Sequence, residues 1–232
     1  MTARPHPYRH FIMAIVALIS LLPAGCGGLL SDAPKRQLYR VNPTLTFPAG
    51  LPHVAAQLLV ATPTAPAGID SRRIALSRSP VSLDYFADAE WTDRVPFLVQ
   101  TALLNGFEKS AAIPAVGPDR GGLRADFILD TAIGDFTAIY DLPTGPPRIV
   151  VRLDATLVRM PERRIVARHS VRREQRGAAD AVPDIVQAFE RALGGAVEEI
   201  VTSTLGNPAL SQGHGSARSR TRSVRPGGVK TP

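Results

Sequence analysis

Histidines are the side chains that most often bind metals or transfer protons at neutral pH, and this chain has five of them. His6 and His10 are four residues apart, but they lie in a segment interpreted below as a removable signal. The other three, His53, His169 and His214, are too far apart in sequence to form a local metal-binding motif. No Gly-x-Ser-x-Gly, P-loop or Gly-x-Gly-x-x-Gly motif is present. The sequence therefore predicts no catalytic activity, no cofactor and no metal site.

Two carboxylates on a predicted strand, Asp126 and Asp130, could suggest acid–base catalysis. Residues four apart on a strand point to the same face of a sheet. At about 3.3 Å per residue they are roughly 13 Å apart, which is too far for a catalytic carboxyl pair. We therefore interpret both as part of a solvated sheet face.

Arginines are concentrated in a predicted hairpin over residues 159–176. Arg168 and Arg172 fall on one face of its second strand, where they could bind phosphate groups or an acidic partner. Charge on an edge strand also protects that edge from aggregation, and this alternative stays open. Arg168 and Arg172 are accordingly candidate partner-binding residues. The arginines of the hairpin are Arg159, Arg163, Arg164, Arg168, Arg172, Arg173 and Arg176.

The amino-terminal segment has the pattern of an export signal. Arg4 and Arg9 precede the apolar run Phe11–Leu22, which is interrupted by Ser20 alone. A basic start, a short apolar stretch and small residues after it are typical of a secretory signal peptide. The run is shorter than the ~18–20 residues that a membrane-spanning helix needs. We predict that residues 1–25 are a signal peptide.

Cys26, the one cysteine of the chain, directly follows this segment in Leu22-Pro23-Ala24-Gly25-Cys26. The sequence resembles a bacterial lipobox, although Pro23 stands where leucine is usual. The resemblance implies that Cys26 is acylated and becomes the mature amino terminus, with residues 26–36 as a lipidated tether. Two or three acyl chains anchor a protein stably to a bilayer. Because Gly27 replaces the aspartate that commonly retains lipoproteins in the inner membrane, the sorting rule implies the outer membrane, facing the periplasm.

The net charge of +7 comes from the two ends of the chain. Without the two bases before residue 25 and the five after residue 206, the chain has 20 bases against 20 acids. A nearly neutral body excludes the basic face that nucleic-acid binding requires. Residues 207–232 are rich in serine, glycine, arginine and proline, and we predict a disordered basic tail.

The middle of the chain predicts two amphipathic helices and a set of strands. The first helix begins at Asp93 and ends at Asn105-Gly106; the second starts near Asp180–Asp184 and runs to Leu205. The pair Gly194-Gly195 in the second helix predicts close packing on the sheet. The expected strands are Gln37–Val41, Val54–Ala61, Ile74–Ser77, Val81–Phe86, Ala125–Tyr140 with a bulge at Gly134, Ile149–Leu157 and Ile165–Arg173.

Three long strands in succession favour an antiparallel meander. The expected fold is α+β: a two-layer sandwich of a mostly antiparallel sheet with the two main helices packed on one face, over residues 37–206. Residues 111–123, rich in proline and glycine, are expected to form a surface loop.

Several segments resemble the ABC-type transport auxiliary lipoproteins, the family of the lipoprotein partner of the paraquat-inducible system. They are Cys26, Tyr39 in Gln37–Val41, the strand Val54–Ala61, Gly68–Ser77, Val81–Trp91, and Asn105-Gly106-Phe107 at the end of the following helix. The similarity covers roughly residues 26–205. In place of the polar-acidic segment usual before the arginine strand, this chain has Gly68–Arg73.

The resemblance implies a non-catalytic lipoprotein that faces the periplasm beside an MCE-domain protein and an ABC permease and ATPase. Such a system moves phospholipid or other apolar cargo between envelope membranes. Trp91, the one tryptophan, is either part of the core or an anchor in that interface. Two alternatives stay open: a periplasmic lipoprotein that binds lipid by itself, and an envelope hydrolase.

Overall fold

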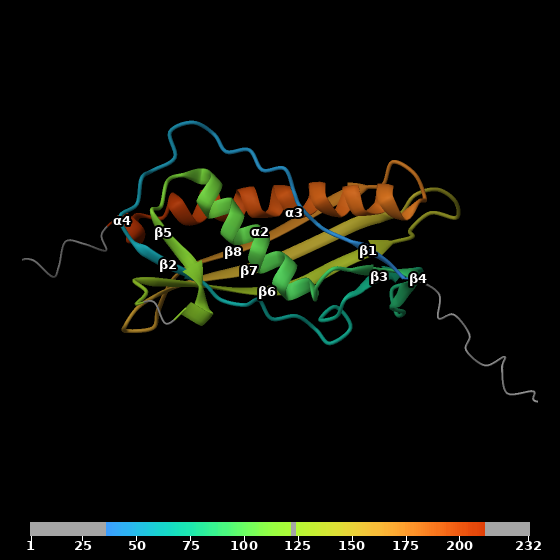
Figure 1. Ribbon diagram of the computed structural model, residues 1–232, viewed down its shortest axis with the longest axis horizontal. Helices are drawn as coiled ribbons and strands as arrows, with labels where there is room; N and C mark the ends of the chain where they lie inside the picture. Colours follow the sequence, from blue (N-terminus) through green and yellow to red (C-terminus); the bar gives the residue numbers. More distant parts are fainter. Residues whose placement is uncertain (1–35, 122–123, 212–232) are drawn as a thin grey trace, which may run out of the picture. The chain divides into compact units, whose positions relative to one another are not determined.

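The structure, a computed structural model, describes residues 36–121 and 124–211 (Figure 1). The predicted signal peptide, Cys26 and most of the predicted tail therefore lie outside the described residues. The elements are β1 (Gln37–Tyr39), β2 (Gln57–Val60), β3 (Arg73–Ser77), β4 (Asp84–Trp91), α2 (Val95–Ser110), β5 (Ala115–Pro118), the 3-10 turn η1 (Asp119–Gly121), β6 (Phe127–Ile139), β7 (Arg148–Arg159), β8 (Arg164–Arg176), α3 (Val182–Leu205) and α4 (Pro208–Ser211).

The three longest strands, β6, β7 and β8, form the predicted antiparallel meander. Apolar and polar residues alternate along β6 and β7, so that one face of these two strands is buried and the other is open to solvent. The register between β6 and β7 shifts between Ile133 and Asp135, which confirms the bulge predicted at Gly134.

The sheet is mixed, so the prediction of a mostly antiparallel sheet is wrong. The free edge of β6 pairs with two strands in parallel: β2 along its first half and β3 at its end. Two further pairs, β2 with β5 and β1 with β4, are parallel as well. Long connections carry the chain back to the same end of the sheet, as parallel pairing requires. Alternation in the sequence predicts that a strand exists but carries no information on its direction.

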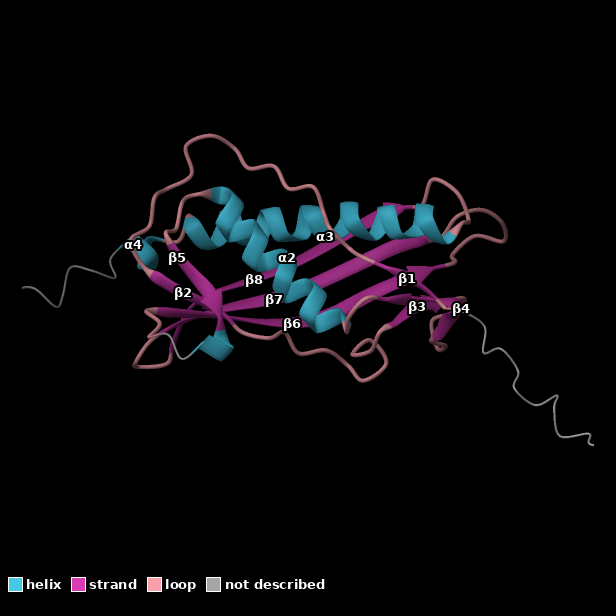
Figure 2. Cartoon of the chain, viewed as in Figure 1, coloured by secondary structure: helices cyan, strands magenta, loops and turns pink. Residues whose placement is uncertain are grey.

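Both main helices cover the same face of the sheet, as predicted (Figure 2). Helix α3 lies over β7 and β8, while α2 packs against α3 and reaches β2 and β5. Neither of the two main helices lies on the other face of the meander (Figure 2). The described residues therefore form two layers, with the sheet exposing one polar face.

Helix α2 does not end at Asn105-Gly106, as predicted, but continues to Ser110. Its carboxyl-terminal cap is Ala111, in the left-handed conformation with φ 51°. A Cβ atom on Gly106 would lie 2.7 Å from Val197 Cγ1 on α3. Gly106 therefore allows the two helices to approach each other, and it does not stop α2.

A segment of irregular backbone, residues 41–53, crosses the outer side of the helix layer, and we call it the strap (Figure 1). The backbone nitrogen of Asn42 donates a 2.9 Å hydrogen bond to Glu190 Oε1, and that of Thr46 donates to Glu198. A Cβ atom on Gly194 would lie 3.2 Å from Pro43. Close packing at Gly194 is therefore against the strap, although its neighbour Gly195 does face β8, as predicted.

The core between sheet and helices is centred on three aromatic rings. Trp91 meets Phe136 and Phe189 edge to face, with ring centroids 5.9 and 5.2 Å apart. Phe136 and Phe189 stack on each other at 4.8 Å. All three side chains are buried, so these residues fasten β4, β6 and α3 together.

Candidate functional site

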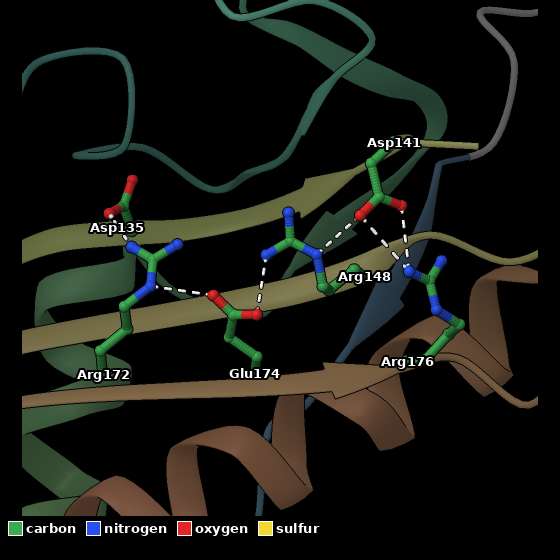
Figure 3. Close-up of polar contacts among 6 residues, drawn as sticks. All are labelled: Asp135, Asp141, Arg148, Arg172, Glu174 and Arg176. Atoms are coloured by element: carbon green, nitrogen blue, oxygen red, sulfur yellow. Dashed lines mark hydrogen bonds and ion pairs between the residues drawn. The ribbon is translucent and has the colours of Figure 1, made fainter.

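The helix-free face of the meander presents charged side chains from all three of its strands. Asp135, Arg152 and Arg172 stand opposite one another across β6, β7 and β8, and Arg148 is opposite Arg176. Because cross-strand neighbours share a face, these groups meet on the open side. Six of them form a continuous chain of ion pairs that we call the ladder (Figure 3): Asp135, Arg172, Glu174, Arg148, Asp141 and Arg176.

The ladder alternates positive and negative groups at hydrogen-bonding distance. At one end, Arg172 donates from Nη1 to Asp135 at 3.4 Å and from Nε to Glu174 at 2.9 Å. Arg148 then connects Glu174 at 2.9 Å with Asp141 at 2.7 Å.

Arg176 closes the other end of the ladder. Its Nη2 donates to Asp141 Oδ1 at 3.1 Å (Figure 3). Each carboxylate therefore lies between two guanidinium groups, because Asp135 also contacts Arg152 at 3.5 Å.

The guanidinium groups lower the pKa of two carboxyls in the ladder. The hydrogen bond from Arg148 is the main cause of the lowered pKa of Asp141, with a further contribution from Arg176. The hydrogen bond from Arg172 is the main cause of the lowered pKa of Glu174, assisted by Arg148. Both carboxylates are thus held in the charged form, which is unsuited to donating or accepting a proton near neutral pH.

The described residues contain no group of three or more His, Cys, Asp or Glu side chains placed to hold a metal ion. No hydrogen bond joins Asp126 and Asp130 among the described residues. Asp126 Oδ2 instead accepts a 2.9 Å hydrogen bond from the backbone nitrogen of Gln57. In the part of the chain that the structure describes, the charged groups of the open face contact mainly one another.

A hollow of about 810 Å³ lies beside the ladder, between the β3–β4 loop and the end of β6. Its lining includes Val81, Leu83, Thr137, Tyr140 and Arg148. Burial, and secondly the 2.6 Å hydrogen bond donated to Asp180, raise the pKa of Tyr140 to about 12. The guanidinium carbon of Arg78 lies 4.5 Å from the centre of the Tyr140 ring, so this wall of the hollow is held in place from two loops.

Trp91 lies in the core and exposes none of its surface, which agrees with the first of the two alternatives that the sequence left open, a core residue or an interface anchor. Its side chain fills the space between β6 and α3, where an exposed anchor is not possible. Arg172 is in the ladder. Arg168 lies on the same face, opposite Thr156 of β7 and farther from the hollow. The structure thus brings Arg168 and Arg172 to one surface and separates Trp91 from both.

Sequence reasoning missed the acidic members of the ladder and the hollow. The position of Arg172 follows from alternation along β8, whereas its pairing with Asp135 depends on the register across β7 and on the bulge. The exposed apolar residues Val81 and Leu83 flank Ser82 just after Pro80, a turn pattern that could have indicated them.

These features define a two-layer α/β fold: a mixed sheet with both main helices on one face and an open, charged face on the other. The family model of the ABC-type transport auxiliary lipoprotein component matches residues 37–201. The chain belongs to this family, as the sequence resemblance implied. A comparison with curated proteins gives no match.

Solved structures share the fold. Protein XCC0632 from Xanthomonas campestris superposes with a TM-score of 0.69 at 28% identity, covering 73% of this chain and 94% of the other. An uncharacterized protein superposes with a TM-score of 0.58 at 13% identity, over 73% of this chain and 99% of that one, which shows the fold alone. Among the described helices, none has the length and apolar character required to cross a membrane.

Proposed function

We propose that this protein is a non-catalytic, periplasm-facing lipoprotein that serves an MCE-type ABC transport system. The acylated Cys26 holds it in the outer membrane, and the system moves phospholipid or other apolar cargo between envelope membranes. The family match over residues 37–201 is the observation that carries the proposal. An ordered domain with a charge-compensated open face supports a role in docking.

The chain enters the described domain at one end and leaves it at the other, and this arrangement supports an adaptor role. β1 begins at Gln37, so the chain from Cys26 enters the sheet there. The chain leaves through α4, where Arg159 of the β7–β8 hairpin donates a 2.9 Å hydrogen bond to the Ala209 carbonyl. Helix α3, with 24 residues, is about 36 Å long and runs toward this second end. An anchor at one end leaves the other end free to reach a partner.

Arg168 and Ile165 on β8 are the proposed partner contacts at the far end. The side chain of Ile165 is 47% exposed, although isoleucine is usually buried. Arg168 is also exposed, and the described residues offer it no ion pair. Arginine is enriched in the buried centre of protein interfaces, and an exposed aliphatic side chain next to it would lose its contact with water on binding.

Affinity purification of the full-length protein from detergent-solubilised membranes tests the proposal. We expect an MCE-domain protein, together with the permease and ATPase, to be recovered with the wild type. Arg168→Glu should reduce that recovery, while Arg191→Ala on the helix side, also exposed, should leave it unchanged. Recovery of no transporter component would overturn the proposal. Stoichiometric phospholipid in the purified protein without such components would support the alternative, a lipoprotein that binds lipid by itself.

A further inference from the structure

Large apolar side chains are exposed at the end of the domain where two loops meet. Val81 and Leu83 in the β3–β4 loop are 96% and 42% exposed, and Leu142 in the β6–β7 loop is 52% exposed. The loops are adjacent, because the backbone nitrogen of Tyr140 donates a 2.8 Å hydrogen bond to the carbonyl of Ser77. We call Val81, Leu83 and Leu142 the apolar tip. Val81 and Leu83 line the hollow, and Leu142 directly follows Asp141, another residue of its lining. Exposed aliphatic residues around one hollow are typical of a surface that binds something apolar.

The start of the described chain leads toward the same end of the sheet. β1 runs parallel to β4, with Gln37 opposite Ala89 and Tyr39 opposite Trp91. Arg36, the first described residue, therefore lies on the side of Asp84, the residue at which β4 begins. Figure 1 shows β1, β3 and β4 together at this end of the sheet, with α4 at the opposite end.

The length of the tether limits how far this end can be from the membrane. Arg36 lies ten positions after Cys26, and a fully extended chain of ten residues reaches about 35 Å. A flexible chain of ten residues is on average much shorter, roughly 16–19 Å end to end. An acylated Cys26 therefore keeps the apolar tip close to the bilayer, while the far end of the domain, another ~36 Å along α3, is directed away.

Asp84, at the start of β4, is an acid beside the tip with no ion pair among the described residues, while the other charged groups there do not oppose contact with lipid. Asp141 is compensated by Arg148 and Arg176, and Arg78 stacks on Tyr140 with its guanidinium group in the same loop as Val81. An arginine next to aliphatic residues is suited to the boundary between headgroups and acyl chains, because the stem stays in the apolar layer while the guanidinium group reaches phosphates.

We propose that the apolar tip is a membrane-docking surface, inserted at the headgroup layer of the bilayer that holds Cys26. Val81 and Leu142 enter the acyl boundary, and Arg78 lies among the phosphates. Docking fixes the orientation of the domain, so that the sheet and helices stand away from the bilayer. The inference rests on the acylation of Cys26 in the proposed function and does not depend on which transporter the protein serves.

Site-specific labelling of the acylated full-length protein tests this surface. Because acylation blocks the thiol of Cys26, Val81→Cys supplies a single labelling site. Ile165→Cys, on an exposed apolar residue at the other end of the domain, is the matched control for the vesicles without transporter proteins, because Ile165 is itself a proposed partner contact. Each protein carries an environment-sensitive fluorophore in vesicles of phosphatidylethanolamine and phosphatidylglycerol, with and without lipids brominated on their acyl chains. Flotation of the vesicles and the emission of Trp91 report anchoring and folding in the same samples.

The expected result is a blue-shifted, bromolipid-quenched label at position 81 and an unaffected label at position 165. The blue shift and the quenching at position 81 should both persist in high salt, since salt screens charges and this contact is apolar. A protein that floats with the vesicles but has an aqueous label at position 81 would overturn the docking surface and leave the acylation of Cys26 standing. A label at position 81 that becomes shielded only when transporter proteins are added would overturn it in favour of a protein contact. Absence of flotation would overturn the anchor and the docking surface together.

Discussion

Gly106 of α2 lies directly against Val197 of α3. A Cβ atom at Gly106 would come within 2.7 Å of Val197 Cγ1 and 3.1 Å of Val201 Cγ2. Neither neighbour can move away easily, because Val197 and Val201 are fully buried. The absence of a side chain at Gly106 therefore determines how closely α2 and α3 pack against each other. Because both helices cover one face of the sheet, it also affects how α2 is placed on that face.

Gly106→Ala is expected to lower the free energy of unfolding by about 1–3 kcal/mol, the usual cost of overpacking a core. The effect has this sign although alanine is favoured over glycine in a helix by about 1 kcal/mol. Urea denaturation followed by circular dichroism measures it. Asn105→Ala, at the exposed neighbouring position, should leave stability nearly unchanged. Adding Val197→Ala to Gly106→Ala should cost less than the sum of the two single changes, since it removes the clashing methyl group. Strict additivity would show that the helices do not approach as described.

Trp91 provides a direct test of the aromatic core. Its burial among Phe136 and Phe189 predicts a blue-shifted emission that iodide hardly quenches in the folded protein and quenches strongly in urea. Phe189→Ala should lower the free energy of unfolding by about 3–5 kcal/mol and shift the emission to the red, because it opens a cavity beside the indole. Iodide quenching of the native protein as strong as that of the unfolded chain would place Trp91 on the surface, and would restore it as a partner-binding candidate.

The sequence predicted the parts of this fold that depend on local pattern. The alternation in β6, β7 and β8 and the apolar faces of both helices predicted five long elements and the side of the sheet that the helices cover. Strand direction was not predictable, because β2 and β3 lie on β6 through long-range pairing that leaves no local trace. β5 was missed because its Gly117 and Pro118 are typical of loops, and its pairing with β2 overrides that preference.

In the candidate site, too, the sequence predicted the residues whose position follows from local pattern and missed those that depend on long-range contacts. Arg172 was found because its face follows from position along one strand. Its partners Asp135 and Glu174 were not found, since they depend on cross-strand register and on side-chain conformation. The end of α2 was predicted wrongly because Gly106 was read as a local stop signal, although its role comes from α3.

Arg172→Ala separates the surface role of the ladder from its structural role. The three side chains at this point, Arg172, Asp135 and Glu174, are 37–47% exposed, so the ion pairs contribute at most about 1 kcal/mol to stability. We expect an unfolding free energy within about 1 kcal/mol of the wild type. A loss of transporter recovery by this variant would therefore report the open face and not misfolding. If recovery stays at the wild-type level, Arg172 is not a partner contact.

Acid should weaken the ladder. The pKa values of Asp141 and Glu174 are lowered in the folded state, so their stabilising contribution is present above the unfolded-state pKa, near 4, and is lost as the pH falls through the lower folded-state values. The double variant Asp141→Asn, Glu174→Gln should be less stable than the wild type at pH 7 and equally stable in strong acid. Urea titrations across this pH range measure the difference. Asp130→Asn, which also removes one acid from this face of the sheet, is the matched charge control. A constant difference at every pH would contradict the assignment.

Alkali should weaken the contact between Tyr140 and Asp180. Burial is the first cause of the raised pKa of Tyr140, about 12, and the 2.6 Å hydrogen bond to Asp180 is the second. An unfolded tyrosine ionises near pH 10, so between about pH 10 and 12 the unfolded state loses a proton that the folded state keeps, and stability falls with rising pH. The loss expected over this range is on the order of 1–2 kcal/mol. Tyr140→Phe cannot ionise and should lack this part of the alkaline decline, while Asp180→Asn should reduce it, because burial still opposes the phenolate. Equal alkaline slopes for the wild type and Tyr140→Phe, measured by urea unfolding with circular dichroism, would show that the Tyr140 hydroxyl is free in solution and that the wall of the hollow is open.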